Sequence, residues 1–422
     1  MLCAIGLGIG YTPLDELEQL SLLAEDRMLE SSIDLFDHEQ TQNMGATLAR
    51  WRRDSPVVRL PDGRVYLTTM ADCWTVLRDP RAFANGNGFK AVEMPDEERM
   101  LGEMDPPRHP AMRRVMRQSF EKNSIEAERP FAAREARRML DTWRAGDKAE
   151  LISQFTDRIS NLLSFQLVGF PLEDTDRIVA WTRELLHSDW PAHNRTARGQ
   201  GLAGAFPEFA AYLDGLVETH RHSEGTNSFI ARLARSQVAG RSLSATELRS
   251  MTGHIVLGGI STTTNLLGNL LYRLLCDPEL HACLRADPRL IPAAVEESLR
   301  LDPPVLFVMR ICKRAVEMGG VAIEAGEQVL VGIASANRDE ALFDDPDDYR
   351  LDRGLPRHIS FSGGAHHCIG AGLARLVAQE ATRAFVERFD VGDVALVPGF
   401  EFEGVPVFLE YGPARLDVEV FS

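Results

Sequence analysis

The sequence predicts a mainly α-helical fold with small β-sheets. From Pro107 to Phe389 the apolar residues recur almost throughout at the spacing of amphipathic helices. Short alternating apolar segments, which are typical of strands, flank or interrupt this helical part. The chain has no internal repeat and no low-complexity linker. We therefore expect a single domain over residues 1–422, in which residues 1–40 form a partly irregular N-terminal segment.

The N-terminal part is expected to contain one amphipathic helix and a hairpin. The helix is predicted over Asn43–Arg53. The hairpin strands are predicted at Val57–Leu60 and Val65–Thr68, around the turn sequence Pro61-Asp62-Gly63. The apolar opening Met1–Gly10 is too short for a membrane span, which needs about 20 apolar residues. It also lacks the basic region and the cleavage site of a secretory signal.

The central part is expected to be helical, and its clearest helix starts at Ser244. Ser244 and Glu247 form a capping box, and the Leu248–Leu275 segment that follows contains no proline. At about 1.5 Å per residue, a single helix of this length would cross the whole molecule. The other predicted helices are Met112–Phe120, Arg129–Arg144, Leu151–Phe170, Phe206–Arg221 and a helix from Ala371 onward. The later predicted strands are Val305–Ile311, Val321–Ile323, Val329–Ile333 and Pro406–Leu409.

The overall composition excludes several classes of function. A formal net charge of −16 and an isoelectric point near 5.2 argue against non-specific binding to nucleic acid or to an anionic membrane. The six cysteines are scattered without a CxxC pair, which is a poor disulfide framework and favours a reducing, cytoplasmic location. They are Cys3, Cys73, Cys276, Cys283, Cys312 and Cys368.

The most informative segment is the loop from Phe361 to Gly370, in which glycines surround one cysteine directly before a helix. Gly363 and Gly364 allow a tight backbone path against a flat group. Cys368 lies at the helix start, where free N–H groups and the helix dipole favour a thiolate. A thiolate in this position can ligate iron. An isolated cysteine of this kind would more often be a buried residue in a glycine-rich turn.

The complete pattern of this loop resembles the haem loop of the cytochrome P-450 superfamily. It reads Phe361-x-x-Gly364-x-His366-x-Cys368-x-Gly370 and continues as Ala371-Gly372-Leu373-Ala374-Arg375. The resemblance implies the triangular, mostly helical haem-thiolate fold and a haem b cofactor (iron protoporphyrin IX). It implies that Cys368 is the iron ligand and that the other pattern residues surround the haem.

Two further groups of residues match motifs of this family. Glu297-Ser298-Leu299-Arg300 resembles the Glu-x-x-Arg motif, whose side chains share a helix face and form an ion pair. Arg353 resembles the arginine that completes this network, and the three residues are expected to support the haem loop. His109, Arg113 and Arg310 resemble the residues that bind the two haem propionates, which need hydrogen-bonding cations. Without the resemblance, Glu297 and Arg300 would be interpreted as an ordinary surface ion pair, and the arginines as solvated side chains.

The segment Gly258-Gly259-Ile260-Ser261-Thr262-Thr263 resembles the family's oxygen-activation signature. The paired glycines cost about 1 kcal/mol each in a helix, and they leave room for dioxygen. Thr262 can return its hydroxyl to a carbonyl one turn back and take part in proton delivery. The family usually has an acid where this chain has Ser261. Serine can relay a proton but cannot supply one, so the usual route is in doubt. Three consequences are open: protons arrive through another acid or water, turnover is slower, or the enzyme uses peroxide.

By resemblance the chain is a soluble, bacterial-type monooxygenase, an oxidoreductase that converts R–H, dioxygen, two electrons and two protons to R–OH and water. Nothing in the chain resembles a flavin or nicotinamide site, so ferredoxin and ferredoxin reductase are the expected electron donors. Arg113, Arg114 and Arg117 are either a docking surface for such a donor or a merely solvated face. Peroxide-driven oxygenation, oxidative coupling, nitric-oxide reduction and a catalytically silent haem or ligand carrier are the alternatives. We expect a monomer.

A medium-sized, largely hydrophobic substrate is expected, because the predicted pocket walls are mostly apolar. The helix period places His254 to one side of the direction in which Thr262 points. It would therefore either lie at the edge of the pocket and bind a polar group of the substrate, or form its hydrogen bonds with neighbours away from the ligand. The residues predicted to line the substrate pocket are Phe89, Met251, His254, Ile255, Val305, Phe307 and Val407.

Overall fold

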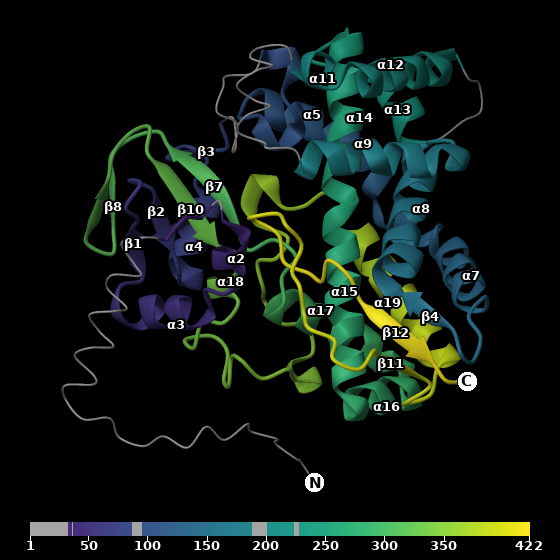
Figure 1. The fold of residues 1–422 in the computed structure, drawn as a ribbon. Coiled ribbons are helices and arrows are strands. Elements are labelled where there is room, and N and C mark those ends of the chain that lie inside the picture. Colours follow the sequence, from purple (N-terminus) through teal and green to yellow (C-terminus); the bar gives the residue numbers. More distant parts are fainter. Residues whose placement is uncertain (1–32, 36, 87–94, 188–200, 223–227) are drawn as a thin grey trace, which may run out of the picture.

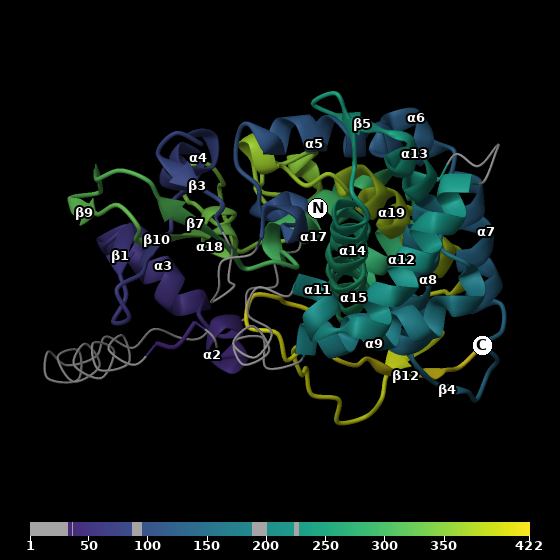
Figure 2. The same cartoon turned by 90° about the horizontal axis from the view of Figure 1, so that it is seen from above.

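The computed structural model describes residues 33–35, 37–86, 95–187, 201–222 and 228–422. Helices make up most of these residues, and a smaller β-rich part lies to one side of them in both views (Figures 1 and 2). The predicted fold class, mainly α with small β-sheets, is confirmed. The Met1–Gly10 segment and most of residues 1–40 lie outside the described residues. None of the helices in the described ranges is long and apolar enough to cross a lipid bilayer.

The helices follow most of the predicted segments, with boundaries that differ by a few residues. They are α2 (His38–Gln42), α3 (Gly45–Asp54), α4 (Met70–Arg78), α5 (Arg108–Arg117), α6 (Lys122–Glu126), α7 (Arg129–Leu140), α8 (Asp157–Val168), α9 (Thr175–His187), α11 (Gly201–Ala205), α12 (Pro207–His222), α13 (Phe229–Arg235), α14 (Ala245–Gly259), α15 (Ser261–Cys276), α16 (Pro278–Ala286), α17 (Ile291–Leu301), α18 (Ile333–Ala336) and α19 (Ala371–Arg388).

The strands form one five-stranded sheet, one three-stranded sheet and two ribbons. They are β1 (Val57–Arg59), β2 (Val65–Leu67), β3 (Phe83–Ala84), β4 (Lys148–Glu150), β5 (Gln237–Val238), β6 (Arg241–Ser242), β7 (Phe307–Cys312), β8 (Val316–Met318), β9 (Val321–Ile323), β10 (Gln328–Gly332), β11 (Val394–Leu396) and β12 (Asp417–Val420). The large sheet has the order β1-β2-β10-β7-β3. Its β2–β10 pair is parallel and its other pairs are antiparallel.

The predicted hairpin is confirmed, whereas the predicted strand at Pro406–Leu409 is wrong. Val57 lies opposite Leu67 across the β1–β2 pair. The later segment folds into a tight turn instead. The Glu410 N–H donates to the carbonyl of Val407 at 2.9 Å, and the Val407 N–H donates to that of Val405 at 2.8 Å. Local turn bonds therefore take up the N–H groups that a strand would pair with a neighbour.

The capping box at Ser244 is present, but the predicted single helix is interrupted. The Ser244 hydroxyl accepts from the Glu247 N–H, and the Glu247 carboxylate accepts from the Ser244 N–H. The helix is interrupted by a bend at Ile260, although its φ of −83° and ψ of −73° remain in the right-handed helical region. Two glycines of low helix propensity precede the break. After it, the hydroxyls of Thr262 and Thr264 each donate to a backbone carbonyl four residues earlier, both at 3.0 Å. In Figure 1, α14 and α15 run through the middle of the helical part.

Candidate functional site

A cavity of about 330 Å³ lies between the α14–α15 break and the loop that precedes α19. Gly258, Gly259 and Thr262 contribute to it from the break, and Cys368 contributes from the loop. The remaining walls come mainly from α5, α8, α17 and β7 with their flanking loops. The structure therefore brings the cysteine loop and the glycine-rich helix segment, about a hundred residues apart in sequence, to one space.

The cysteine loop is held from behind by α4. Gly364 has a φ of +63°, and a side chain there would overlap the Leu77 carbonyl of α4. Gly363 has extended backbone, but a Cβ atom on it would overlap the ring of Trp74. The N–H of Cys368 donates to the Phe361 carbonyl at 2.8 Å and closes the loop. The glycines thus serve the packing against α4, and neither Gly363 nor Gly364 lines the cavity.

Cys368 lines the cavity, into which its side chain is exposed. Burial raises its pKa, while the backbone N–H groups of Gly370 and Ala371 and the charge of Arg113 act in the opposite direction. The N–H groups expected at the helix start are therefore present. Burial outweighs them, however, and the pKa of the thiol is raised.

Several cationic or polar groups at this site have no carboxylate partner. Arg310 is 5% exposed and donates to the carbonyl of Met309 at 2.8 Å, and burial lowers its pKa to about 10. Arg113 donates to the carbonyl of His367. In the described ranges, no carboxylate lies within ion-pairing distance of either arginine. Both arginines line the cavity. Buried unpaired cations are costly, so this arrangement suits an anionic ligand.

Two histidines lie beside these arginines. His109 is buried, and its Nε2 has no hydrogen-bond partner in the part of the chain that the structure describes. Its ring lies 3.9 Å from that of His366, which lines the cavity and contacts the side chain of Asn85 at 3.1 Å. Burial, with neighbouring positive charge, lowers the pKa of His109 to about 4 and that of His366 to about 3. Both rings are therefore neutral near pH 7, and Nε2 of His109 remains available to a ligand.

The helix break orients Thr262 and Ser261 differently. Thr262 lines the cavity, and its hydroxyl donates to the Gly258 carbonyl. Ser261 is not among the lining residues, and its hydroxyl donates to Glu410 Oε1 at 2.7 Å. Glu410 belongs to the turn that was wrongly predicted as a strand. No sequence pattern indicates its approach to the helix.

Only some of the residues predicted to line the substrate pocket line this cavity. His254, Ile255 and Val305 line it, whereas Met251, Phe307 and Val407 do not. Phe307 is displaced by the alternation of strand β7. Val308 and Arg310 face the cavity, while Phe307 packs on Tyr66 in the opposite direction.

The other two displaced residues follow from their local structure. Met251 lies one helical turn before His254 and Ile255, fully buried in the main core. Val407 is carried away by the turn that replaces the predicted strand. The Phe89 prediction lies outside the described residues.

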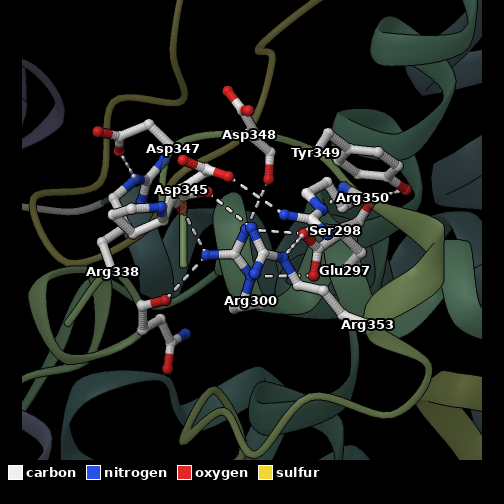
Figure 3. Close-up of polar contacts among 12 residues, drawn as sticks. Glu297, Ser298, Arg300, Arg338, Asp345, Asp347, Asp348, Tyr349, Arg350 and Arg353 are labelled. Carbon is white, nitrogen blue, oxygen red and sulfur yellow. Dashed lines mark hydrogen bonds and ion pairs between the residues drawn. The ribbon is translucent and has the colours of Figure 1, made fainter. Parts of the chain in front are cut away.

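The three residues predicted as a structural network do contact one another (Figure 3). Arg300 and Glu297 are at most 1% exposed and form a two-bonded ion pair, with nitrogen–oxygen distances of 2.7 and 2.9 Å. Arg353 donates to the same carboxylate at 3.1 Å. Arg300 gives its other N–H groups to the carbonyls of Asn337, Pro346 and Asp348. All five donors of its guanidinium are thus satisfied.

The next residue, Glu296, ties this helix to the cysteine loop, and sequence reasoning missed it. Its carboxylate accepts from Arg375 of α19 and from His358, just before the loop. Burial raises its pKa, but these bonds outweigh burial and hold the pKa at about 2. Arg375 also lies over the ring of Phe361, 4.5 Å from its centroid. The only sequence signal for Glu296 is its place beside Glu297.

The site residues fit the haem that the sequence resemblance implies. A thiol opens into an apolar-walled cavity, where Arg113 and Arg310 offer positive groups for carboxylates. His109 is not among the lining residues, but its ring centroid lies 3.9 Å from that of His366, which does line the cavity. Across the cavity from the cysteine loop, Gly258 leaves open the space that a side chain would fill. The two arginines suit the carboxylates of the haem group.

Comparisons with known proteins agree with this arrangement. A family model for cytochrome P-450 matches residues 56–398. The chain is 33% identical to the monooxygenase PikC of Streptomyces venezuelae, over 81% of this chain and 83% of PikC. It is also 33% identical to a vitamin D(3) 25-hydroxylase of Pseudonocardia autotrophica, over 87% and 91% of the two chains. The solved structure of the cytochrome CYP109Q5 from Chondromyces apiculatus superposes with a TM-score of 0.80 at 30% identity, covering 92% and 98%. The chain belongs to the cytochrome P-450 family.

Proposed function

We propose that this oxidoreductase of the P-450 family binds haem b through Cys368 and inserts one oxygen atom of O2 into a medium-sized, largely hydrophobic substrate. The observation that carries the proposal is the position of the thiol. It opens into the same cavity as Thr262 and two arginines without carboxylate partners. When bound, the haem would supply the iron at which oxygen is activated.

The residues of the chain take distinct roles in this proposal. Arg113, Arg310 and His109 would hold the propionates, since charge-assisted hydrogen bonds to carboxylates are strong. Phe361, Gly364, His366 and Gly370 shape the loop that presents the thiol. Glu297, Arg300 and Arg353 hold the helix behind this loop.

The walls of the cavity favour an apolar substrate. Leu101, Phe120, Val168, Ile255, Leu266 and Val305 are among the lining residues. His254 also lines the cavity, so one polar group of the substrate would find a partner there. The vitamin D(3) 25-hydroxylase related to this chain is named for a hydroxylation of a largely hydrocarbon molecule, which is the class of substrate that we propose.

Electrons are proposed to come from a ferredoxin and its reductase. We expect no turnover when purified haem-loaded protein is given NAD(P)H alone, because no flavin or nicotinamide site is recognisable in the sequence. Adding a generic ferredoxin and reductase should start substrate oxidation, with one atom of labelled O2 recovered in the product. Turnover without the pair would contradict this part of the proposal. Arg114 and Arg117, both exposed on α5, are the proposed docking cations.

The Thr262→Ala variant is expected to divert reducing equivalents into hydrogen peroxide. The hydroxyl would be lost from the cavity wall next to the helix break, and proton delivery there would lose an organised donor. Product per NAD(P)H should fall about tenfold or more, while haem content stays unchanged. Peroxide and product are measured together in the reconstituted system. An unchanged ratio would show that Thr262 does not take part.

A further inference from the structure

Glu410 is a buried carboxyl group that the sequence resemblance does not account for. It is 4% exposed. Ser261 donates to its Oε1 at 2.7 Å, and the Asn265 amide donates to its Oε2 at 2.8 Å. Both partners belong to the first turn and a half of α15. The carboxyl therefore touches the residue that stands where the family usually has an acid.

The surroundings of Glu410 favour its protonated form. Burial raises its pKa to about 7, and the hydrogen bonds from the neutral Ser261 and Asn265 only partly oppose this. Among the described residues, no cation pairs with its carboxyl group. A carboxyl in this state can donate a proton near neutral pH and can take one up again.

The position of Glu410 links it to the cavity on two sides. Its backbone pairs with that of Val305, a residue of the cavity wall. Its side chain meets Ser261, whose neighbour Thr262 lines the cavity. Ser261 and Thr262 directly follow the helix break at Ile260. The carboxyl thus lies behind the wall of the site and in contact with the break.

We propose that Glu410 takes the place of the missing acid and supplies protons to the site through Ser261. The inference rests on the proposed oxygen-activating function. When Glu410 is protonated, its O–H can donate to Ser261 Oγ across the same 2.7 Å contact. In each transfer the Glu410 carboxyl gives this proton to Ser261 Oγ, and the Ser261 hydroxyl passes its own proton to a water molecule at the cavity wall beside Thr262. No bond to carbon changes and no electrons move. Glu410 is left as a carboxylate that accepts from Ser261 and Asn265 until solvent returns a proton.

A second cavity offers a place from which that proton can return. It has a volume of about 340 Å³ and is lined by Gln42 and Tyr411. Gln42 donates to the backbone carbonyl of Glu410 at 3.1 Å, and Tyr411 is the next residue. The walls of this cavity include Asp347, which is exposed. Solvent-connected space therefore comes within one residue of Glu410.

The other buried carboxyl beside α15 is less suited to this role. Asp157 meets the hydroxyl of Thr264 at 3.4 Å, but its Oδ2 is paired with Arg183 at 2.6 Å. Burial raises the pKa of Asp157, but Arg183 favours its ionised form. Thr264, like Ser261, does not line the cavity, and its hydroxyl already donates to the Ile260 carbonyl at 3.0 Å.

The test compares Glu410→Gln with the wild type in haem-loaded, full-length protein. Glutamine keeps the size of the side chain. Its amide oxygen can accept from Asn265 and its amide N–H can donate to Ser261 Oγ, but it cannot give up a proton. We expect product formation to fall about a hundredfold, at the lower end of what a general acid contributes. The reducing equivalents that no longer form product should appear as hydrogen peroxide. Ser261→Ala, which leaves Glu410 in place but disconnects it, should have the same effect.

Two further variants separate proton supply from loop anchoring. Asn269→Leu removes two hydrogen bonds that hold the neighbouring backbone, to the carbonyls of Asp302 and Tyr411, and should leave coupling unchanged, because Asn269 lines neither cavity. Adding Ser261→Asp to Glu410→Gln returns an acid to the helix and should restore coupling. Ser261→Asp alone should bring no gain. Uncoupling in Asn269→Leu equal to that in Glu410→Gln, or no rescue in the double variant, would overturn the inference.

A spectroscopic measurement tests the inference without turnover. The infrared spectrum of the wild type at pH 6 should contain the C=O stretch of a protonated carboxyl that is missing in Glu410→Gln. Because the pKa is raised, this band should be present below about pH 7 and disappear above it. Identical spectra would overturn the inference. A wild type that fails to oxygenate any substrate defeats the proposed function and this inference with it. A wild type that oxygenates no better than Glu410→Gln defeats the inference alone.

Discussion

The Cys368→Ser protein is expected to fold and to lose oxygen-driven turnover completely. Serine has nearly the same size, and the loop around it is held by contacts that do not involve the thiol. These are the close packing of Gly363 and Gly364 against α4 and the bond from the Cys368 N–H to the Phe361 carbonyl. A serine hydroxyl is no substitute for a soft anionic sulfur ligand on iron. Product formation with the ferredoxin pair measures the effect.

The matched control for this variant is Cys283→Ser. Cys283 is exposed on α16 and does not line the cavity, so its replacement should leave turnover and thermal stability unchanged. Circular dichroism of both variants checks the fold. Turnover retained in Cys368→Ser would show that the iron ligand is another residue.

The Arg300→Met variant is expected to be destabilised by about 3–5 kcal/mol, the usual cost of removing one partner from a buried ion pair. The Glu297 carboxylate would lose two of its hydrogen bonds at a position 1% exposed. The carbonyls of Asn337, Pro346 and Asp348 would lose a donor as well. Denaturant unfolding of the haem-loaded protein measures the difference, and haem content should fall with stability.

Arg289→Met is the control for this variant. Arg289 pairs with Asp287 at the surface, where its side chain is 90% exposed. Exposed ion pairs contribute little to stability, so this change should be nearly neutral. Similar unfolding curves for Arg300→Met and Arg289→Met would contradict the supporting role assigned to the Arg300 network.

The parts of the site that sequence predicts well are local in the chain. The cysteine loop is one contiguous pattern, and Glu297 and Arg300 are one helical turn apart. In each case the spacing alone determines which side chains meet. The capping box at Ser244 is local in the same sense, and the structure has both of its bonds.

The parts that sequence reasoning missed depend on contacts between distant segments or on competing local bonds. Ser261 and Glu410 are 149 positions apart, and no periodicity connects them. The apolar residues after Pro406 favour a strand, but the turn bonds take up their N–H groups instead. Phe307 was assigned to the pocket together with Val305, but β7 begins only at Phe307, and within this strand Val308 and Arg310 are the residues that face the cavity. The break at Ile260 was missed, although the two features that accompany it are local in the sequence: the paired glycines, and the bond from the Thr262 hydroxyl to a carbonyl one turn back.

The central claim is that Cys368 holds a haem iron as a thiolate, and the carbonyl spectrum of the reduced wild-type protein tests it most directly. Haem-loaded protein is reduced under carbon monoxide and its Soret band recorded, since the position of this band reports the ligand opposite the carbonyl. We predict the thiolate-type band in the wild type and in Cys283→Ser, and its loss in Cys368→Ser. A wild-type spectrum of the kind given by a histidine-ligated haem, or the thiolate-type band retained in Cys368→Ser, would contradict the account.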